Sequence, residues 1–159
     1  NKLISIDKCL PKKISEITKI LDSDLKDQPK IDIVLKEFVE FINETGNDIY
    51  LIAHNNDSFD RLFLENAFSN CKISLDCNIK YIDSLRFCQK LLPDRFSYSL
   101  KSLCKHYEIN QENAHRAYDD AYNLYLLYKK MGAVFSMKSD YSYKYILNNP
   151  DIIINYIKI

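Results

Sequence analysis

The chain has 159 residues, of which 47% are hydrophobic, so it is long enough and apolar enough for one globular domain with a full core. Only two glycines and four prolines argue against a disordered or linker-rich chain. The 22 basic and 22 acidic residues cancel, which leaves no bulk positive field for nucleic acid or for an anionic membrane surface. An enzyme that holds phosphate through bound metal ions needs no such field, so neutrality does not exclude that class.

The five cysteines are odd in number and form no C-x-x-C pair. This pattern is typical of reduced thiols in an intracellular protein, cytoplasmic or nuclear, rather than of a zinc site or a disulfide framework. No run approaches the roughly 20 apolar residues of a membrane span, and no signal peptide is visible, so we expect no membrane partner. The chain begins at Asn1, and its two methionines are Met131 and Met137, which favours a piece of a longer product.

Helical and strand patterns alternate along most of the chain. Apolar residues at helical spacing predict an amphipathic helix over residues 30–45, ended by Gly46. Residues 49–53, IYLIA, are a short apolar run between turn formers, which is typical of a strand buried on both faces. Residues 79–83, IKYID, predict a second strand. Further helices are predicted over 58–69, 84–92, 98–107 and 114–131. This alternation predicts an α/β layered domain with parallel strand pairing.

The last segment, residues 133–159, has a different composition. It is rich in tyrosine and isoleucine, is broken at Asn149-Pro150, and carries no motif. We therefore divide the chain into a domain over residues 1–132 and a C-terminal extension over 133–159. The extension either packs on the domain as a helix or begins a truncated unit.

Asp60 is the first candidate for a metal ligand. Ligand sites of α/β sheets form where strands end and helices begin, and Asp60 lies near such a turn. Flanked by Phe59 and Leu62, it is expected to be partly buried, and a buried carboxylate is costly unless it is paired or coordinates a metal. Two interpretations stay open: Asp60 holds a metal ion, or it caps a helix or bonds Arg61 or His54.

Asp120 is the second candidate. Five apolar residues share one face of the predicted helix 114–131, which we expect to point at the core: Ala117, Ala121, Leu124, Tyr128 and Met131. At about 100° per residue, Asp120 lies roughly 60° from that stripe, while Asp119 points about 160° away. Asp120 can therefore reach a site at the margin of the core, and Asp119 is expected to be a solvated surface charge.

His115 is the candidate general base. It precedes Asp120 by five residues and is expected in the loop or first turn ahead of the helix, where it can approach a substrate. With an ordinary pKa of about 6.5, it could take a proton from water at neutral pH. The alternative is a surface or capping histidine.

These segments together resemble a known family. The stretches AHNNDSFD (residues 53–60) and HRAYDDA (residues 115–121), with H-x-A-x-x-D spacing, resemble the DnaQ-like, DEDDh-type 3′-to-5′ exonucleases of the ribonuclease H-like superfamily. Residues 81–109 look like the stretch between the family's second and third motifs, including an aspartate after a strand, here Asp83. The segment ISEITKI, residues 14–20, is similar to the one that follows the family's third strand. The eight-residue motif and SEIT are closer to the three-prime repair exonucleases.

The resemblance implies a fold and marks a departure from it. It implies the ribonuclease H-like exonuclease fold, a mixed sheet flanked by helices. The family's first motif is D-x-E, which places two carboxylates on one face of a strand, and no D-x-E occurs in these 159 residues. We therefore expect this chain to lack the first strands of the fold and two of its four metal-binding carboxylates.

The resemblance also implies a mechanism. Two Mg²⁺ or Mn²⁺ ions would hydrolyse the phosphodiester bond at a DNA or RNA 3′ end, expected to be single-stranded. Asp60 and Asp120 would be metal ligands, and His115 the general base. Ile17 and Phe59 match positions that pack on the terminal nucleotide, and ordinary core packing is their alternative. The resemblance leaves open a homodimer or an association with a polymerase.

Three interpretations of function follow. In the first, the complete protein is an exonuclease and this chain alone is inactive, because the D-x-E carboxylates are missing. In the second, an exonuclease-like module has lost catalysis and binds nucleic acid or protein. In the third, an unrelated α/β domain matches the motifs by chance, which predicts that Asp60 and Asp120 lie far apart, beyond about 10 Å, too far to share one metal site.

Overall fold

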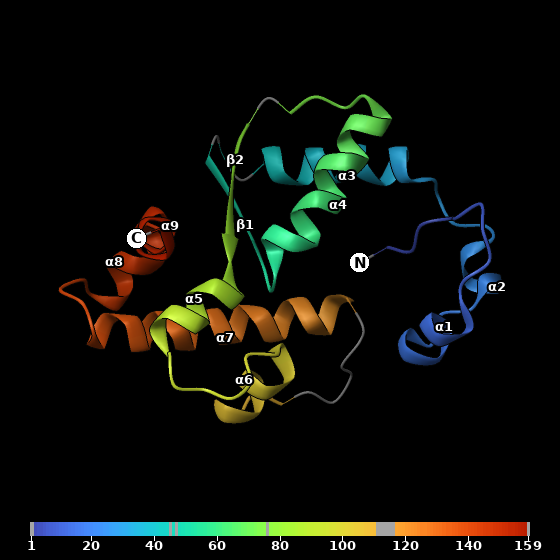
Figure 1. The fold of residues 1–159 in the computed structure, drawn as a ribbon. Helices are drawn as coiled ribbons and strands as arrows, with labels where there is room; N and C mark the ends of the chain where they lie inside the picture. Colours follow the sequence, from blue (N-terminus) through green and yellow to red (C-terminus); the bar gives the residue numbers. More distant parts are fainter. Residues whose placement is uncertain (1, 45, 47, 76, 111–116, 159) are drawn as a thin grey trace.

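The computed structural model describes residues 2–44, 46, 48–75, 77–110 and 117–158. Two parallel strands, β1 (Asp48–Ala53) and β2 (Asn78–Asp83), form the described sheet and pair in register, with Ala53 opposite Asp83. A 3-10 turn, η1 (Asn56–Ser58), and helix α4 (Asp60–Cys71) connect them, as parallel pairing requires (Figure 1). Because the strands are parallel, the residues that follow both carboxyl ends meet at one edge of the sheet.

Helices lie around this strand pair, except α1 and α2, which lie apart from it (Figure 1). The helix bounds are α1 (Lys12–Thr18), α2 (Asp22–Leu25), α3 (Ile31–Asn43), α5 (Ser84–Leu91), α6 (Leu100–His106), α7 (Ala117–Met137), α8 (Tyr143–Asn148) and α9 (Asp151–Lys158). The α/β class and both predicted strands are confirmed. The helices predicted over 30–45, 58–69, 84–92 and 98–107 are present, whereas α7 continues past its predicted end at residue 131 and the sequence does not predict α1 and α2. No helix in the described part of the chain is long and apolar enough to cross a membrane.

Strand β1 is less enclosed than the sequence predicts. Only Ile49 of this strand is buried, and the residues from Tyr50 to Ala53 are half-buried, so the prediction of a strand buried on both faces is wrong. The physical reason is the size of the sheet: within the described residues β1 has one neighbouring strand, and the described sheet is entirely parallel rather than mixed.

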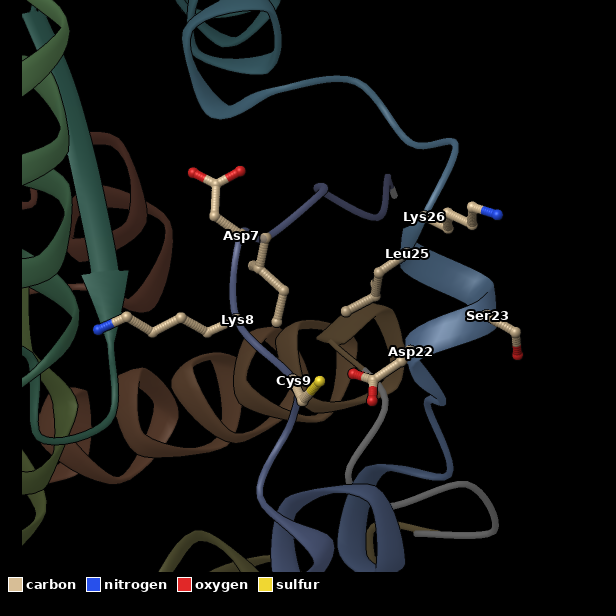
Figure 2. Close-up of a pocket in the computed structure, with 8 residues that line it drawn as sticks. Asp7, Lys8, Cys9, Asp22, Ser23, Leu25 and Lys26 are labelled. Carbon is tan, nitrogen blue, oxygen red and sulfur yellow. The ribbon is translucent and has the colours of Figure 1, made fainter.

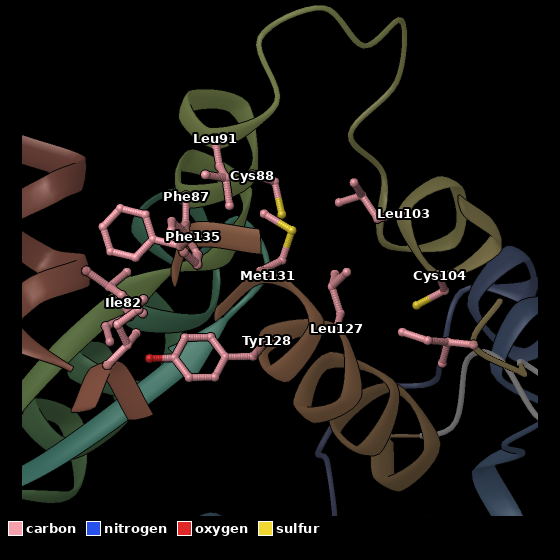
Figure 3. Packing of buried hydrophobic residues seen from close by; sticks show 13 residues of the cluster. Ile82, Phe87, Cys88, Leu91, Leu103, Cys104, Leu127, Tyr128, Met131 and Phe135 are labelled. Carbon is pink, nitrogen blue, oxygen red and sulfur yellow. The ribbon is translucent and has the colours of Figure 1, made fainter. Parts of the chain in front are cut away.

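The core lies where α5, α7, α8 and α9 meet strand β2. Phe87 of α5 is fully buried and meets the ring of Phe135 edge-on at 5.7 Å between centroids (Figure 3). The buried cluster consists of Ile82, Phe87, Cys88, Leu91, Leu103, Cys104, Ile109, Leu127, Tyr128, Met131, Phe135, Ile146 and Ile153. All five cysteines are free, and burial raises the pKa of the Cys88 thiol to about 12, which makes it a packing group rather than a nucleophile.

Helix α7 turns its predicted apolar stripe to the core only in its second half. Tyr128 and Met131 of the stripe are buried, but Ala117 and Ala121 are exposed and Leu124 is half-buried. These three residues of the first half line an open cleft. The predicted core face is therefore correct for the second half of the helix and wrong for the first.

The C-terminal segment contributes to the same core. Ile146 of α8 and Ile153 of α9 are fully buried in the cluster. The Asp151 carboxylate, in the first turn of α9, accepts hydrogen bonds from Lys80 Nζ and from the Tyr50 hydroxyl, both at 2.8 Å. These two donors lower the pKa of Asp151, with Lys80 the larger cause. Helix α9 is thereby attached to both strands, and α7 itself continues to Met137.

We predict that Ile153→Ala lowers the free energy of unfolding by about 2–5 kcal/mol, because it leaves a cavity in the core. The matched control is Ile33→Ala on α3, where the side chain is 49% exposed, and its effect should stay within about 0.5 kcal/mol. Urea unfolding followed by circular dichroism measures both. Equal stability of the two variants would contradict the assignment of α9 to the core.

Candidate active site

The turn after β1 is held by a buried amide. Asn55 has φ +70°, a left-handed conformation that asparagine tolerates better than most residues. Asn56 is 2% exposed, and its Nδ2 donates to the carbonyls of Leu51 and Ile82, both at 3.2 Å. One side chain thus ties the turn to both strands, which fixes where the following helix begins.

Asp83 holds the same turn from the other strand. Its buried carboxylate accepts hydrogen bonds from the backbone N–H groups of Asn55 at 3.1 Å, Asp57 at 3.1 Å and Leu85 at 2.9 Å. The bond from Leu85 also caps the N-terminus of α5. Arg86 adds an ion pair to Asp57 at 2.8 Å. Three backbone donors that the strands leave unpaired therefore share one acceptor.

His54 joins this turn to the loop before α6. Its Nε2 lies 2.7 Å from the Tyr98 carbonyl and its Nδ1 lies 3.0 Å from Ser84 Oγ. Because a carbonyl only accepts, the proton is on Nε2. Ser84 Oγ also lies 3.1 Å from the Ala53 carbonyl, so its one proton is shared between that carbonyl and Nδ1 of the neutral ring. Burial lowers the pKa of His54, which favours this neutral form.

A cleft with a volume of about 550 Å³ opens at the carboxyl ends of the strands. Its lining comes from β1, α4, α6 and α7 and consists of Ile52, Ala53, His54, Asp60, Leu100, Lys101, Ala117, Asp120, Ala121 and Leu124. Two carboxylates from distant parts of the sequence, Asp60 and Asp120, therefore line one cavity. This shared lining favours the motif interpretation over a chance match.

Asp60 is the first residue of α4 and lies at the mouth of the cleft. It also lines a neighbouring apolar groove of about 400 Å³, together with Phe59 and Phe63. Asp60 is more exposed than the sequence predicts. Partial removal from water nevertheless raises the pKa of Asp60, and the charge of Asp83 adds to the increase; its own backbone N–H and His54 act against it.

The helical wheel separates the two aspartates of α7 correctly, but only one of the two exposure predictions holds. Asp120 is half-buried and lines the cleft, whereas Asp119 does not line it. Asp119 is half-buried as well, so this surface charge is less exposed than the sequence predicts. The first turn of α7 is more enclosed than an isolated helix would be.

The other predicted site residues are not in the cleft lining. Phe59 is 59% exposed, and its ring centroid lies 5.4 Å from that of Phe63. Ile17, in α1, is 43% exposed and lines neither the cleft nor the groove beside Asp60. Neither side chain is a core residue, which disfavours the packing alternative for both. His115 lies outside the described residues.

A smaller pocket of about 310 Å³ lies between residues 6–9 and helix α2 (Figure 2). The Asp22 carboxylate faces it and accepts a hydrogen bond from the backbone N–H of Leu10 at 2.8 Å. The pocket shares no residue with the cleft, and its thiol, Cys9, is exposed. None of the predicted site residues lies there.

The donor set of the cleft suits a hard cation. Within the described residues, no group of three or more histidine, cysteine, aspartate or glutamate side chains is gathered in metal-binding geometry. Asp60 and Asp120 nevertheless offer carboxylate oxygens to one cavity. Mg²⁺ commonly binds proteins through only one or two carboxylates and completes its shell with water and substrate phosphate. The residues present therefore fit Mg²⁺ or Mn²⁺ better than zinc.

Comparison with known proteins identifies a family. The sequence profile of the RNase T-type family, described as exonuclease, matches residues 1–128. The chain belongs to this exonuclease family. A DNA polymerase III PolC-type protein of Oceanobacillus iheyensis is 38% identical over 115 residues, which cover 72% of this chain and 8% of the relative. The 3′-5′ exonuclease DinG of Staphylococcus haemolyticus is 33% identical over 127 residues, 80% of this chain and 13% of the relative.

A solved structure supports the fold of this exonuclease domain. Exonuclease X in complex with 5′ overhanging duplex DNA matches with a TM-score of 0.61 and 20% identity, over 90% of this chain and 75% of that chain. The ribonuclease H-like exonuclease fold is thereby confirmed. The chain spans only a small part of the two relatives named above, so the activities of those whole proteins do not transfer to it.

The sequence analysis did not identify the residues that hold the candidate site in place. Asp83 and Asn56 have no chemical signature of their own, yet both are buried and hold the turn. The dipeptide Asp83-Ser84 directly after a strand is a typical helix cap and could have revealed the first. The burial of Asn56 depends on β2, which is distant in sequence, and carried no local signal.

We predict that Asp83→Ala lowers the free energy of unfolding by at least about 2 kcal/mol, because it leaves buried N–H donors without an acceptor. The matched variant Asp83→Asn keeps one acceptor oxygen and should lose less. Urea unfolding compares them. An Asp83→Ala protein as stable as the parent would contradict the role of this carboxylate.

A second prediction concerns Asp60 and pH. Its pKa is raised in the folded chain, so the ionised carboxylate costs folding free energy above that pKa, and the cost disappears when the group is protonated. In EDTA, Asp60→Asn should therefore melt higher than the parent at neutral pH and equally at about pH 3, below the ordinary aspartate pKa.

The control for this experiment is Asp119→Asn, which removes a charge that does not line the cleft and should show no such pH-dependent gain. Adding Mg²⁺ at neutral pH should stabilise the parent and narrow its difference from Asp60→Asn. A variant less stable than the parent at neutral pH would refute the interpretation.

Proposed function

We propose that the protein is a metal-dependent 3′-5′ exonuclease that hydrolyses phosphodiester bonds at the 3′ end of a nucleic acid. The observation that carries the proposal is that Asp60 and Asp120 line one cleft at the carboxyl ends of two parallel strands. Family membership supports the reaction class, and one relative is named for 3′-5′ exonuclease activity.

Three cleft residues have a role in this proposal. Asp60 and Asp120 hold the cations through their carboxylates, and Lys101, which lines the same cleft, contacts a substrate phosphate. When bound, Mg²⁺ or Mn²⁺ would supply the positive charge that polarises the phosphate and activates water. The raised pKa of Asp60 suits this role, since a carboxylate left short of positive charge gains most from a cation.

The remaining roles concern the proton and the terminal nucleotide. His115, five positions before Asp120, takes the proton of the attacking water. Phe59 presents an exposed ring directly before Asp60, where a terminal base could stack. Ile17 would flank the same nucleotide through its exposed side chain.

The absence of D-x-E bears on the activity of this chain by itself. The two carboxylates found here are half of the set that the DEDDh pattern uses, and fewer oxygen ligands mean weaker cation binding. We therefore propose that residues 1–159 alone turn over slowly or not at all. A second candidate function, a binding module without catalysis, is favoured by this same absence, whereas the shared cleft of Asp60 and Asp120 favours the enzyme.

Several finer statements belong to the proposal. A polymerase association is supported by the DNA polymerase III relative, and proofreading or repair would be its purpose. A homodimer is the alternative assembly, and DNA or RNA the substrate. The free thiols support an intracellular location. A particular kinship with three-prime repair exonucleases rests on the AHNNDSFD spacing and on SEIT.

Release of nucleotides from a 3′-labelled single strand in Mg²⁺ tests the function. A protein that joins this chain to a D-x-E segment encoded upstream should be active, and Asp120→Asn should lower its rate by at least about 100-fold, since lost support of a metal ligand already costs 10–100-fold. The matched control, Asp119→Asn, changes the neighbouring residue outside the cleft lining and should keep most of the activity.

Two results would contradict the proposal. Robust turnover by residues 1–159 that Asp120→Asn abolishes would show that the first motif is dispensable. An extended protein without turnover in Mg²⁺ or Mn²⁺ would favour the binding module.

A further inference from the structure

Helix α7 presents three tyrosines to solvent on one face, which we name the tyrosine ladder: Tyr118, Tyr122 and Tyr125. Their residues are 63%, 51% and 53% exposed. The rings of Tyr118 and Tyr122 are parallel, with centroids 6.5 Å apart and an interplanar angle of 1°, and Tyr122 and Tyr125 follow at 6.2 Å. Large aromatic rings gathered in water stabilise a fold little, and exposed patches of this kind mark interaction sites.

The ladder ends in positive charge. Lys129 is one helical turn beyond Tyr125, and its Nζ lies 5.2 Å from the centroid of that ring. Lys129 and Lys130 then line a pocket of about 530 Å³ between α7, α8 and the loop after α6. Glu108 is the one acidic residue of that lining, so two cations face one anion. The C-terminal end of the ladder therefore suits an anionic partner.

The ladder also borders the candidate active site. Ala121 lines the cleft, and it lies three residues after Tyr118 and four before Tyr125. Residues at these spacings are neighbours on a helix surface. From Tyr118 to Lys129 the helix rises about 16 Å, the length of about five nucleotides at ~3.4 Å each. One continuous surface thus leads from the cleft wall to the lysines.

We propose that the tyrosine ladder binds the single strand whose 3′ end enters the cleft, with bases stacked on Tyr118, Tyr122 and Tyr125 and phosphates at Lys129 and Lys130. This inference rests on the proposed exonuclease function and adds to it a binding surface outside the cleft. Aromatic rings stack on any base, while lysines track the backbone, so binding tolerates sequence. Paired bases keep their faces covered, so a duplex is held less tightly than a single strand.

A protein partner is the rival occupant. Tyrosines are common in protein interfaces, but lysine is depleted at the centre of such interfaces. Here a lysine lies over the last ring of the ladder, and a second lies beside it in the adjoining pocket. That combination of stacked rings and cations favours a single-stranded nucleic acid over a second copy of this chain.

Fluorescence anisotropy of a labelled oligothymidylate, titrated with the 159-residue chain in EDTA, tests the proposal without hydrolysis. Tyr122→Ala should weaken binding about 5- to 150-fold, the value of one stacked base, and Tyr122→Phe should keep most of the affinity. Lys129→Gln should lower the slope of log affinity against log salt by about 0.7.

The matched control is Tyr141→Ala. Tyr141 is also exposed, at 45%, and stacks on Tyr145 with centroids 5.8 Å apart, but it lies outside the ladder. Its removal should leave affinity unchanged. Circular dichroism establishes that each variant is folded. Equal losses in Tyr141→Ala and Tyr122→Ala, or parental affinity in Tyr122→Ala, would overturn the proposal.

Two further measurements distinguish failure of this inference from failure of the proposed exonuclease function. Binding in EDTA and hydrolysis in Mg²⁺ are measured separately, so a failure to hydrolyse and a failure to bind are distinct results. Light scattering gives the mass of each variant. If Tyr122→Ala converts a dimer to a monomer while oligonucleotide affinity stays the same, the ladder is an interface between copies and the proposal is wrong.

Discussion

The arrangement of the cleft depends on the hydrogen bonds that the buried Asp83 carboxylate accepts. The turn from His54 to Ser58 has no partner strand for its N–H groups, and buried donors must be satisfied. Asp83 accepts two of them and one from the start of α5. Since α4 begins directly after this turn, the position of Asp60 follows from the same bonds. A carboxylate of β2 thus determines where a carboxylate of α4 meets the cleft.

The neighbouring aspartates show how environment divides their roles. Asp83 is enclosed and fully hydrogen-bonded, so its charge stabilises the turn. Asp60, beside it, is short of donors, and its raised pKa reflects both lost hydration and the charge of Asp83. The ionised Asp60 carboxylate is unfavourable in the folded chain, so a bound cation can stabilise it. The two residues therefore act together, one holding the other in place.

The sequence predicts the elements well because their periodicities are local. The two strands, most helix boundaries within a few residues, and the placement of Asp60 and Asp120 in one cleft lining follow from pattern and motif. Burial was harder, since it depends on neighbours. The exposure of Asp60, the half-burial of Asp119 and the open faces of β1 come from how α4, α7 and a two-stranded sheet are placed. The clamp that Asn56 forms depends on Ile82, from another part of the chain.

The surroundings of helix α7 explain why its apolar stripe predicts core burial correctly in only one half of the helix. A helix with one buried stripe has a single apolar face, but α7 has two such faces. One face packs in the core through Leu127 and Met131 in the second half and lines the cleft through Asp120 and Ala121 in the first, and the other face carries the tyrosine ladder. Apolar and aromatic residues therefore occupy both faces of the helix. One helix that contributes to a core, a cleft and a binding surface must carry apolar or aromatic residues toward each of them. Its sequence therefore shows only weak amphipathicity.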